Sequence, residues 1–302
     1  MLLKSRTKSN ELLAYRYLNT RMELTDKENF HYLNLEKGYE GEVKFDQLTE
    51  TLREERYIIN DLLLEVNNSY FQIDSIIISQ GVIYLIDIKN YYGDFYLKSD
   101  NLYTVKTNRE YKNPLDQLKR STTLFNQLLQ KHKHNYLVES FIIFINPEFT
   151  LYQVPIDQPI IFPTQINRFI NELNKTPSQL NNGHKILAQE LLTLHKPKNP
   201  FTTFPQYHYD HLQKGVYCKN CMSLLDIVKN NFFVCRNCGE QEKIEFTILR
   251  GIEEFRLLFP ERKLTTHNIY EWCNLCLHQK TLCRVLKKNF TSYGKTKNTY
   301  YK

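Results

Sequence analysis

Two apolar stretches decide the fold: Gln72-Ile73-Asp74-Ser75-Ile76-Ile77-Ile78-Ser79 and, beyond a turn, Gly81-Val82-Ile83-Tyr84-Leu85-Ile86-Asp87-Ile88-Lys89. Their density of aliphatic, β-branched residues predicts two consecutive strands, and Gln80-Gly81 is typical of the turn between them. Asp87 and Lys89 stand two residues apart, so both side chains project from one face of their strand. A charge is costly to bury unless it is paired or binds a metal, so this polar pair in an apolar strand needs a partner.

The flanking sequence alternates between helical and strand patterns up to about residue 194. Helical signals occupy 1–37, 40–52, 113–130, 164–174 and 183–194, and further strand patterns occupy 57–65, 90–94, 97–107 and 140–144. The order helix, strands, helix, strand, helix predicts an α/β sandwich with one mixed sheet. Three prolines within 195–205 indicate a stiff linker that closes this domain.

Asp74 and Asp87, on neighbouring strands, can together hold a hard cation such as Mg²⁺ through their oxygens. Such an ion polarises a phosphodiester and lowers the pKa of a bound water that attacks it. A lysine beside the ion can orient that water or offset the developing negative charge. This arrangement resembles the Asp…(Asp/Glu)-x-Lys pattern of the restriction-endonuclease-like superfamily, although a salt bridge at a strand end explains the short pattern equally simply.

Five separated motifs extend the resemblance over about residues 37–145. They are Lys37-Gly38-Tyr39-Glu40-Gly41-Glu42, Asn60-Asp61, Gln72-Ile73-Asp74, Gly81-Val82-Ile83…Ile86-Asp87-Ile88-Lys89-Asn90…Gly93, and Asn113-Pro114…Gln117. In this order and spacing the chain resembles the nuclease-related domain family, known as NERD. The resemblance implies a restriction-endonuclease-like fold and metal-dependent cleavage of nucleic acid.

The resemblance also implies a role for each matching residue. Glu42 corresponds to the helical glutamate, an outer metal ligand or base, and Lys89 corresponds to the catalytic lysine. Asp74 and Asp87 correspond to the pair that holds Mg²⁺ or Mn²⁺, although the family usually has Glu at the second position, one methylene longer. The polar positions that contact phosphate or the attacking water correspond to Gln72 and Gln117. The enzymatic interpretation requires the four catalytic side chains to converge in one cleft.

The C-terminal third carries all seven cysteines, and four of them form two Cys-x-x-Cys pairs. Cys218 and Cys221 are separated from Cys235 and Cys238 by thirteen residues, a spacing typical of a zinc ribbon with a closed, structural Cys₄ site. The remaining three lie in predicted helices, where they are either buried as small hydrophobes or part of a second metal site with His267 or His278. These three are Cys273, Cys276 and Cys283.

The net positive charge also lies at the C-terminal end. Residues 211–302 hold 16 Lys+Arg and 8 Asp+Glu, whereas residues 1–210 hold 24 and 25. Helices expected at 243–259, 266–274 and 278–289, followed by a hairpin at 292–302, give the outline of a winged or simple helix-turn-helix module. The last helix and the hairpin carry the basic residues Arg284, Lys287, Lys288, Lys295, Lys297 and Lys302. We expect Arg284, Lys287 and Lys288 to contact the substrate.

Interleaved Tyr293, Tyr300 and Tyr301 add stacking surfaces to these cations, a combination that binds nucleic acid, with a solvated helix end as the alternative. An apolar fraction of 41% suits packed cores. The sequence has no apolar run long enough for a membrane span and no signal peptide at its start, and its paired cysteines suit a reducing compartment, so we expect a cytoplasmic location.

The sequence therefore predicts a nuclease-related domain with lead-in helices at 1–194, a linker at 195–212, a zinc ribbon at 213–242 and a helical DNA-binding-like module at 243–302. The expected function is Mg²⁺-dependent hydrolysis of DNA. The alternative is a non-catalytic nucleic-acid-binding or interaction protein that uses an inactive nuclease-like fold.

Overall fold

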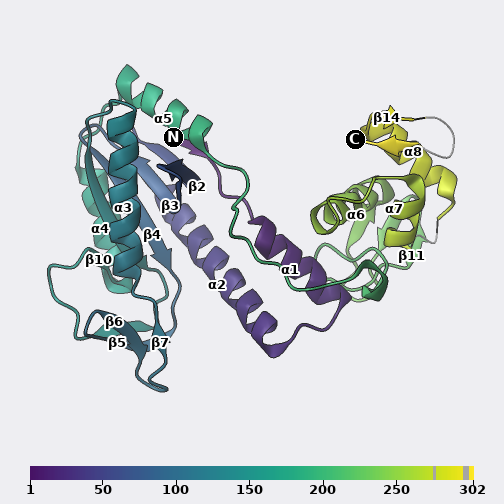
Figure 1. Ribbon diagram of the computed structural model, residues 1–302, viewed down its shortest axis with the longest axis horizontal. Helices are drawn as coiled ribbons and strands as arrows, with labels where there is room; N and C mark the ends of the chain where they lie inside the picture. The colour runs from purple at the N-terminus through teal and green to yellow at the C-terminus, as the bar shows by residue number, and fades with distance from the viewer. Residues whose placement is uncertain (275–276, 295–298) are drawn as a thin grey trace. The chain divides into compact units, whose positions relative to one another are not determined.

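The computed structural model describes residues 1–274, 277–294 and 299–302. The chain divides into two compact units (Figure 1). Unit 1 comprises residues 1–8 and 33–201, and unit 2 comprises residues 9–32 and 202–302. The expected mixed α/β architecture is confirmed, with eight α-helices in the described part of the chain.

Unit 1 is built on a six-stranded sheet with the order β1-β2-β3-β4-β8-β10. Its strands are β1 (Leu2–Lys4), β2 (Tyr57–Val66), β3 (Ser69–Ile78), β4 (Val82–Lys89), β8 (Leu137–Phe144) and β10 (Ile160–Ile161). The pairs β2–β3 and β3–β4 are antiparallel, whereas β4–β8 and β8–β10 are parallel. The sheet is therefore mixed, as the sequence predicts.

Helices cover both faces of this sheet because the central strands are apolar on both sides. The cluster on one face joins Ile76, Ile78 and Leu85 to α3 (Pro114–Lys131) and α5 (Asn182–Leu194). The cluster on the other face joins Ile77 and Ile86 to α2 (Asp26–Thr49) and α4 (Ile166–Lys175), which follows the short 3-10 helix η1 (Pro163–Gln165). Strand alternation then places Asp87 and Lys89 on the α3 face, with Leu85.

Two sequence expectations for unit 1 are wrong. Residues 2–4 form a strand and not a helix, because the edge of β2 offers unpaired backbone groups: β1 pairs with it in parallel, and Ile58 N–H donates to the Met1 carbonyl at 3.0 Å. The sheet is also not single. A four-stranded sheet of order β7-β6-β5-β9 is formed by β5 (Gly93–Lys98), β6 (Asn101–Thr104), β7 (Glu110–Tyr111) and β9 (Phe149–Tyr152).

Unit 2 has its own core, formed where helices pack on a small three-stranded sheet. The helices are α1 (Asn10–Arg21), α6 (Ile244–Leu258), α7 (Thr266–Cys273) and α8 (Gln279–Asn289), with a 3-10 turn η2 (Tyr209–His211). The sheet is formed by β11 (Ile227–Lys229), β12 (Phe232–Val234) and β13 (Gln241–Lys243), and a terminal pair is formed by β14 (Ser292–Tyr293) and β15 (Tyr300–Tyr301). Trp272 is fully buried at the centre of this core.

Among the described residues, no helix combines the length and the apolar character that crossing a membrane requires.

Candidate functional site

The pairing of β3 with β4 brings the two aspartates onto adjacent strands. The register joins Ser75 to Ile86 and Ile76 to Leu85, so Asp74 stands beside the carboxyl end of β4. The Asp74 carboxylate accepts a hydrogen bond from the Ile88 N–H at 2.8 Å. This bond fixes the carboxylate of Asp74 next to the Asp87–Lys89 segment.

Asp87, Lys89 and Gln117 form one hydrogen-bonded cluster at this point. The Lys89 ammonium lies 2.8 Å from Asp87 Oδ2 and 3.0 Å from Oδ1, and it donates to Gln117 Oε1 at 3.3 Å. The Gln117 amide donates to Asp87 Oδ1 at 3.3 Å. Asp87 is buried, and both of its carboxylate oxygens lie beside the Lys89 ammonium. The cluster thus contains a buried carboxylate that is paired with Lys89 and lies near the carboxylate of Asp74.

The N-terminus of helix α3 positions Gln117 in the cluster. Asn113 is the N-cap: its side chain accepts from the Leu115 N–H at 3.0 Å and donates to the Asp100 carbonyl at 2.8 Å. Pro114 follows at the first helical position, where its missing N–H is not needed. The Asn-Pro-x-x-Gln motif is therefore a helix start that places Gln117 one turn into the helix.

The electrostatics of the cluster set the charge of its lysine. Burial raises the pKa of Asp87 to about 6, although the Lys89 ammonium opposes this shift. For Lys89, burial acts to lower the pKa, but the carboxylates of Asp87 and Asp74 outweigh it and raise the pKa above its ordinary value. These carboxylates therefore favour the charged form of Lys89.

Glu42, on α2, is held by an arginine that no sequence motif had indicated. The Arg6 guanidinium donates to Glu42 Oε2 at 2.8 Å, to both carboxylate oxygens of Asp46 at 3.0 Å, and to the Asp74 carbonyl at 2.8 Å. Burial raises the pKa of Glu42 to about 8, the Asp74 carboxylate adds to this shift, and Arg6 opposes it. Arg6 thus links α2 to the strand that carries Asp74.

A glycine lets α2 approach the end of β4 closely. A Cβ atom on Gly41 would lie 2.6 Å from the Asn90 Cβ, closer than side chains tolerate, and would make a tight contact of 3.0 Å with the Ile145 Cγ2. The Asn90 amide donates to the Lys37 carbonyl at 2.8 Å. The Gly-Glu motif on α2 and the Lys-Asn motif on β4 are therefore in contact through Gly41 and Asn90.

Gln72 is exposed and forms a hydrogen bond with Asp61 of β2. Its amide donates to Asp61 Oδ1 at 3.0 Å, and the Lys4 ammonium lies 3.8 Å from the other oxygen of that carboxylate. Asp61 has a φ of 56°, which places it at an irregularity between the Asn60–Ser75 and Leu62–Ile73 pairs. The sequence alone did not predict that the Asp61 carboxylate would lie beside Gln72.

The structure brings the predicted residues together only in part. Within the described ranges, the carboxylates of Glu42, Asp74 and Asp87 do not form a group whose ligand atoms all lie within 4.8 Å of one another. Asp87, Lys89 and Gln117 do touch, and Asp74 interacts electrostatically with Asp87, Lys89 and Glu42. Carboxylate oxygens are ligands that a hard cation takes, and Asp74 and Asp87 offer them from adjacent strands.

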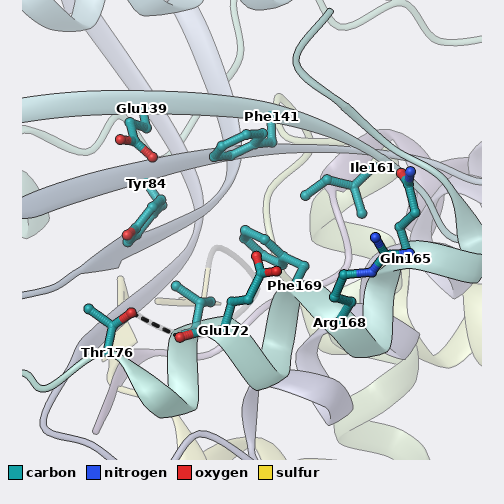
Figure 2. A pocket seen from close by; sticks show the side chains of 10 residues that line it. Tyr84, Glu139, Phe141, Ile161, Gln165, Arg168, Phe169, Glu172 and Thr176 are labelled. Carbon is teal, nitrogen blue, oxygen red and sulfur yellow. Dashed lines mark hydrogen bonds between the residues drawn. The ribbon is translucent and has the colours of Figure 1, made fainter. Parts of the chain in front are cut away.

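A pocket of about 410 Å³ opens on the opposite face of the sheet (Figure 2). Tyr84 and Phe141 line it from the strands, and Phe169 and Arg168 line it from α4. Its wall contains none of the residues that the sequence predicts for catalysis or substrate binding. The pocket is therefore separate from the acidic–lysine cluster.

Four cysteines of unit 2 converge tightly, and this cluster is compatible with the zinc ribbon that the sequence predicts. The sulfur atoms of Cys218, Cys221, Cys235 and Cys238 all lie within 4.8 Å of one another, with Cys218–Cys238 at 3.6 Å and Cys221–Cys235 at 3.4 Å. In a tetrahedral Cys₄ zinc shell with Zn–S bonds of about 2.3 Å, the sulfurs stand about 3.8 Å apart. The observed separations are close to that value.

Both Cys-x-x-Cys turns have the same backbone form. The Met222 N–H donates to the Cys218 carbonyl at 3.1 Å, and the Gly239 N–H donates to the Cys235 carbonyl at 3.0 Å. Met222 and Gly239 each follow the first cysteine by four residues, and both have a positive φ, of 56° and 74°. Two equivalent turns therefore present two pairs of sulfurs to one point.

The other cysteines do not add to this cluster in the described part of the chain. Cys273 is fully buried, and burial raises the pKa of its thiol to about 12. The Cys283 sulfur lies 3.9 Å from the Thr266 hydroxyl. Cys276 lies outside the described residues, as do Lys295 and Lys297. Among the residues that the structure describes, neither Cys273 nor Cys283 belongs to a group of candidate metal ligands.

The basic residues of the C-terminal helix lie on its solvent face. Arg284, Lys287 and Lys288 are exposed, whereas Leu282 and Leu286 are buried in the unit 2 core. Lys288 is paired with Glu245 at 2.9 Å, so part of its charge is neutralised. Arg284 and Lys287 remain the exposed cations of this face that the sequence predicts for substrate contact.

Comparison with known proteins agrees with the motifs. The chain matches no curated protein and no solved structure. A family model does match, and the matched segment contains Glu42, Asp74, Asp87, Lys89 and Gln117. Residues 37–145 of this chain match the nuclease-related domain, NERD.

Proposed function

We propose that the protein hydrolyses phosphodiester bonds of DNA in a Mg²⁺- or Mn²⁺-dependent reaction, using the nuclease-related domain of unit 1. In this proposal the nuclease-related domain lies within residues 1–194, followed by a linker at 195–212, a zinc ribbon at 213–242 and a DNA-binding helical module at 243–302. Residues 9–32, with α1, belong to the compact unit 2. The nuclease-related match itself supports a nuclease-like function.

The observation that carries the proposal is the Asp87–Lys89–Gln117 cluster beside Asp74. A salt bridge to Lys89 pairs the buried Asp87 carboxylate, but the Asp74 carboxylate lies near it as a second negative charge. The pKa of Asp87 is raised because its carboxylate is buried near Asp74. A hard cation between the two aspartates would take their oxygens as ligands and offset the repulsion between the two carboxylates.

Bound there, Mg²⁺ would polarise the scissile phosphate and lower the pKa of a coordinated water. Lys89 holds its proton, so it donates hydrogen bonds to a phosphate oxygen or to the attacking water and offsets the developing charge. Gln117 fixes the direction of the Lys89 ammonium through its Oε1. Arg6 holds Glu42 near Asp74, from where Glu42 can assist as an outer ligand or base.

The four-cysteine cluster would hold Zn²⁺ as a structural ion, because four protein ligands leave no open position. Thiolates that bind zinc must remain reduced, which suits a cytoplasmic location. The exposed cations of α8 would supply phosphate contacts for Arg284, Lys287 and Lys288.

The test is cleavage of linear, circular and single-stranded DNA with added Mg²⁺ or Mn²⁺, without chelator. Lys89→Ala should lose on the order of a hundredfold or more in rate, as does removal of one group that stabilises transition-state charge. Asp74→Ala should lose activity and also weaken Mn²⁺ binding measured by calorimetry. Lys119→Ala is the matched control, because Lys119 is an exposed lysine on the same helix as Gln117.

Activity that is equal in wild type, Lys89→Ala and Lys119→Ala would assign the cutting to a contaminant. A wild-type protein that binds DNA but does not cut it with either ion would refute the enzymatic proposal.

The second candidate is a nucleic-acid-binding protein without catalysis. One observation favours it: Glu42 is paired with Arg6, and the described carboxylates do not form a three-ligand group within 4.8 Å. In that case Asp74→Ala and Lys89→Ala would leave DNA binding and Mn²⁺ affinity unchanged.

A further inference from the structure

The C-terminal part of unit 2 has the connectivity of a winged helix-turn-helix. Helix α6 is followed by Leu264, then by α7, α8, β14 and β15. Leu264 forms an antiparallel bridge with Tyr301, whose N–H donates to the Leu264 carbonyl at 2.8 Å. Ser292 pairs with the other side of Tyr301. The β14–β15 pair is thereby joined to the segment between α6 and α7.

The core fixes which face of α8 reaches solvent. Leu282, Val285 and Leu286 are buried with residues of α6 and α7, and Tyr301 and Leu264 belong to the same core. At 100° per residue these three side chains cover one side of the helix. The opposite side is therefore free of core contacts.

That opposite side is basic and carries no acid. Lys280, Arg284 and Lys287 are exposed and fall at i, i+4 and i+7, so they form one stripe along α8. The helix has no Asp or Glu between Gln279 and Asn289. The Lys288–Glu245 ion pair lies at the edge of this stripe and ties the end of α8 to the start of α6.

The tyrosine rings of the β14–β15 pair are covered by each other and by neighbouring lysines. Tyr293 and Tyr300 stack on each other, with ring centroids 5.6 Å apart and planes at 21°. The Lys302 ammonium lies 5.5 Å from the Tyr293 ring, and the Lys263 ammonium lies 5.3 Å from the Tyr300 ring. Single-strand binding uses aromatic faces that are free to receive bases. These two rings already share their faces with each other and with lysines.

We propose that α8 is the helix that enters the major groove of duplex DNA, with the Lys280–Arg284–Lys287 stripe against the phosphates and the β14–β15 pair beside it. A helix with its side chains is about 10–12 Å across and fits a major groove about 12 Å wide. The deep, narrow major groove of duplex RNA does not admit it. This inference rests on the nucleic-acid-binding part of the proposed function and names its partner, independently of cleavage.

The test is fluorescence anisotropy with labelled duplex DNA, its single strand and the corresponding RNA duplex. The full-length Lys89→Ala protein is used without added Mg²⁺, so that no cleavage interferes, and without chelator, which would strip the cysteine cluster. Duplex DNA should bind most tightly. The triple variant Lys280→Ala, Arg284→Ala, Lys287→Ala should lose on the order of ten- to a hundredfold in affinity at moderate salt.

The salt dependence gives a second readout. Affinity for DNA falls as salt rises, and loss of three phosphate contacts should make the slope of log affinity against log salt less steep by about 2.7. Between 50 and 200 mM salt, the affinity of the wild type should therefore fall by about 40-fold more than that of the variant. A control with the same charge change, placed on unit 1, is Lys175→Ala, Lys185→Ala, Lys198→Ala. Circular dichroism and zinc content should be unchanged in both variants.

Equal affinity of the two triple variants for the duplex would overturn the inference. So would tighter binding of the single strand or the RNA duplex than of duplex DNA. If duplex binding behaves as expected but wild-type protein never cleaves, the nuclease proposal fails while this one stands.

Discussion

Two glycines of α2 offer a matched test of how the nuclease-related domain is assembled. In Gly41→Ala the added Cβ would lie 2.6 Å from the Asn90 Cβ, whereas in Gly38→Ala it would meet nothing within 4 Å. Both positions lie inside the same helix, so both substitutions gain the same helix propensity, about 1 kcal/mol. Overpacking typically costs about 1–3 kcal/mol. Relative to the wild type, Gly38→Ala should therefore raise the free energy of unfolding by about 1 kcal/mol. Relative to Gly38→Ala, Gly41→Ala should have a free energy of unfolding that is about 1–3 kcal/mol lower.

The assay is urea unfolding, and the single tryptophan separates the two units. Trp272 is the one tryptophan of the chain and lies in unit 2. Far-UV circular dichroism reports both units, whereas tryptophan fluorescence reports unit 2. We expect the two variants to differ from each other by circular dichroism and to agree with the wild type by fluorescence.

The reasoning fails if Gly41→Ala is as stable as Gly38→Ala. In that case α2 would not contact Asn90 closely, and Glu42 would not be held beside Asp74 in the way the structure shows. If Gly41→Ala folds, the proposed nuclease activity should also fall, because relief of the clash moves Glu42 with its helix.

Three further predictions concern stability and metal binding. Asn113→Ala removes the N-cap of α3 and should lower the free energy of unfolding of unit 1 by about 0.5–2 kcal/mol, measured by circular dichroism in urea. Asn113→Asp keeps the cap but cannot donate to the Asp100 carbonyl, so it should recover only part of this loss. Cys221→Ser should lose bound zinc, measured by elemental analysis, whereas Cys283→Ser should keep it. Glu254→Ala leaves a buried guanidinium without its carboxylate partner and should destabilise unit 2 by about 3–5 kcal/mol, followed by tryptophan fluorescence, whereas exposed Glu253→Ala should be nearly neutral.

Local signals in the sequence predicted much of the secondary structure. The helix expected at 113–130 is α3 at Pro114–Lys131, because Asn113 and Pro114 are both start signals. The strand expected at 81–89 is β4 at Val82–Lys89. The cysteine cluster was predicted from spacing alone, because each Cys-x-x-Cys turn is short enough to determine its own geometry.

What the sequence did not predict depends on contacts between distant segments. Strand β1 exists because β2 offers it an edge, and a three-residue strand has no periodicity to detect. Arg6 is 36 residues from Glu42, so its contact could not be predicted from local pattern. The irregularity at Asp61 likewise appears only once β2 and β3 are paired.

The contacts of Arg6 bear on how Glu42 could act in catalysis. Arg6 is bound in a bidentate manner by Asp46 and also donates to the Asp74 carbonyl, so its guanidinium keeps three hydrogen bonds if Glu42 turns away. Among the described residues, the Glu42 carboxylate has the single hydrogen bond from Arg6 to give up, and burial near Asp74 already raises the pKa of Glu42. A cation at Asp74 would favour the charged form of Glu42 and compete with Arg6 for it. The same arrangement therefore holds Glu42 near the aspartates and leaves it free to change partner when an ion binds.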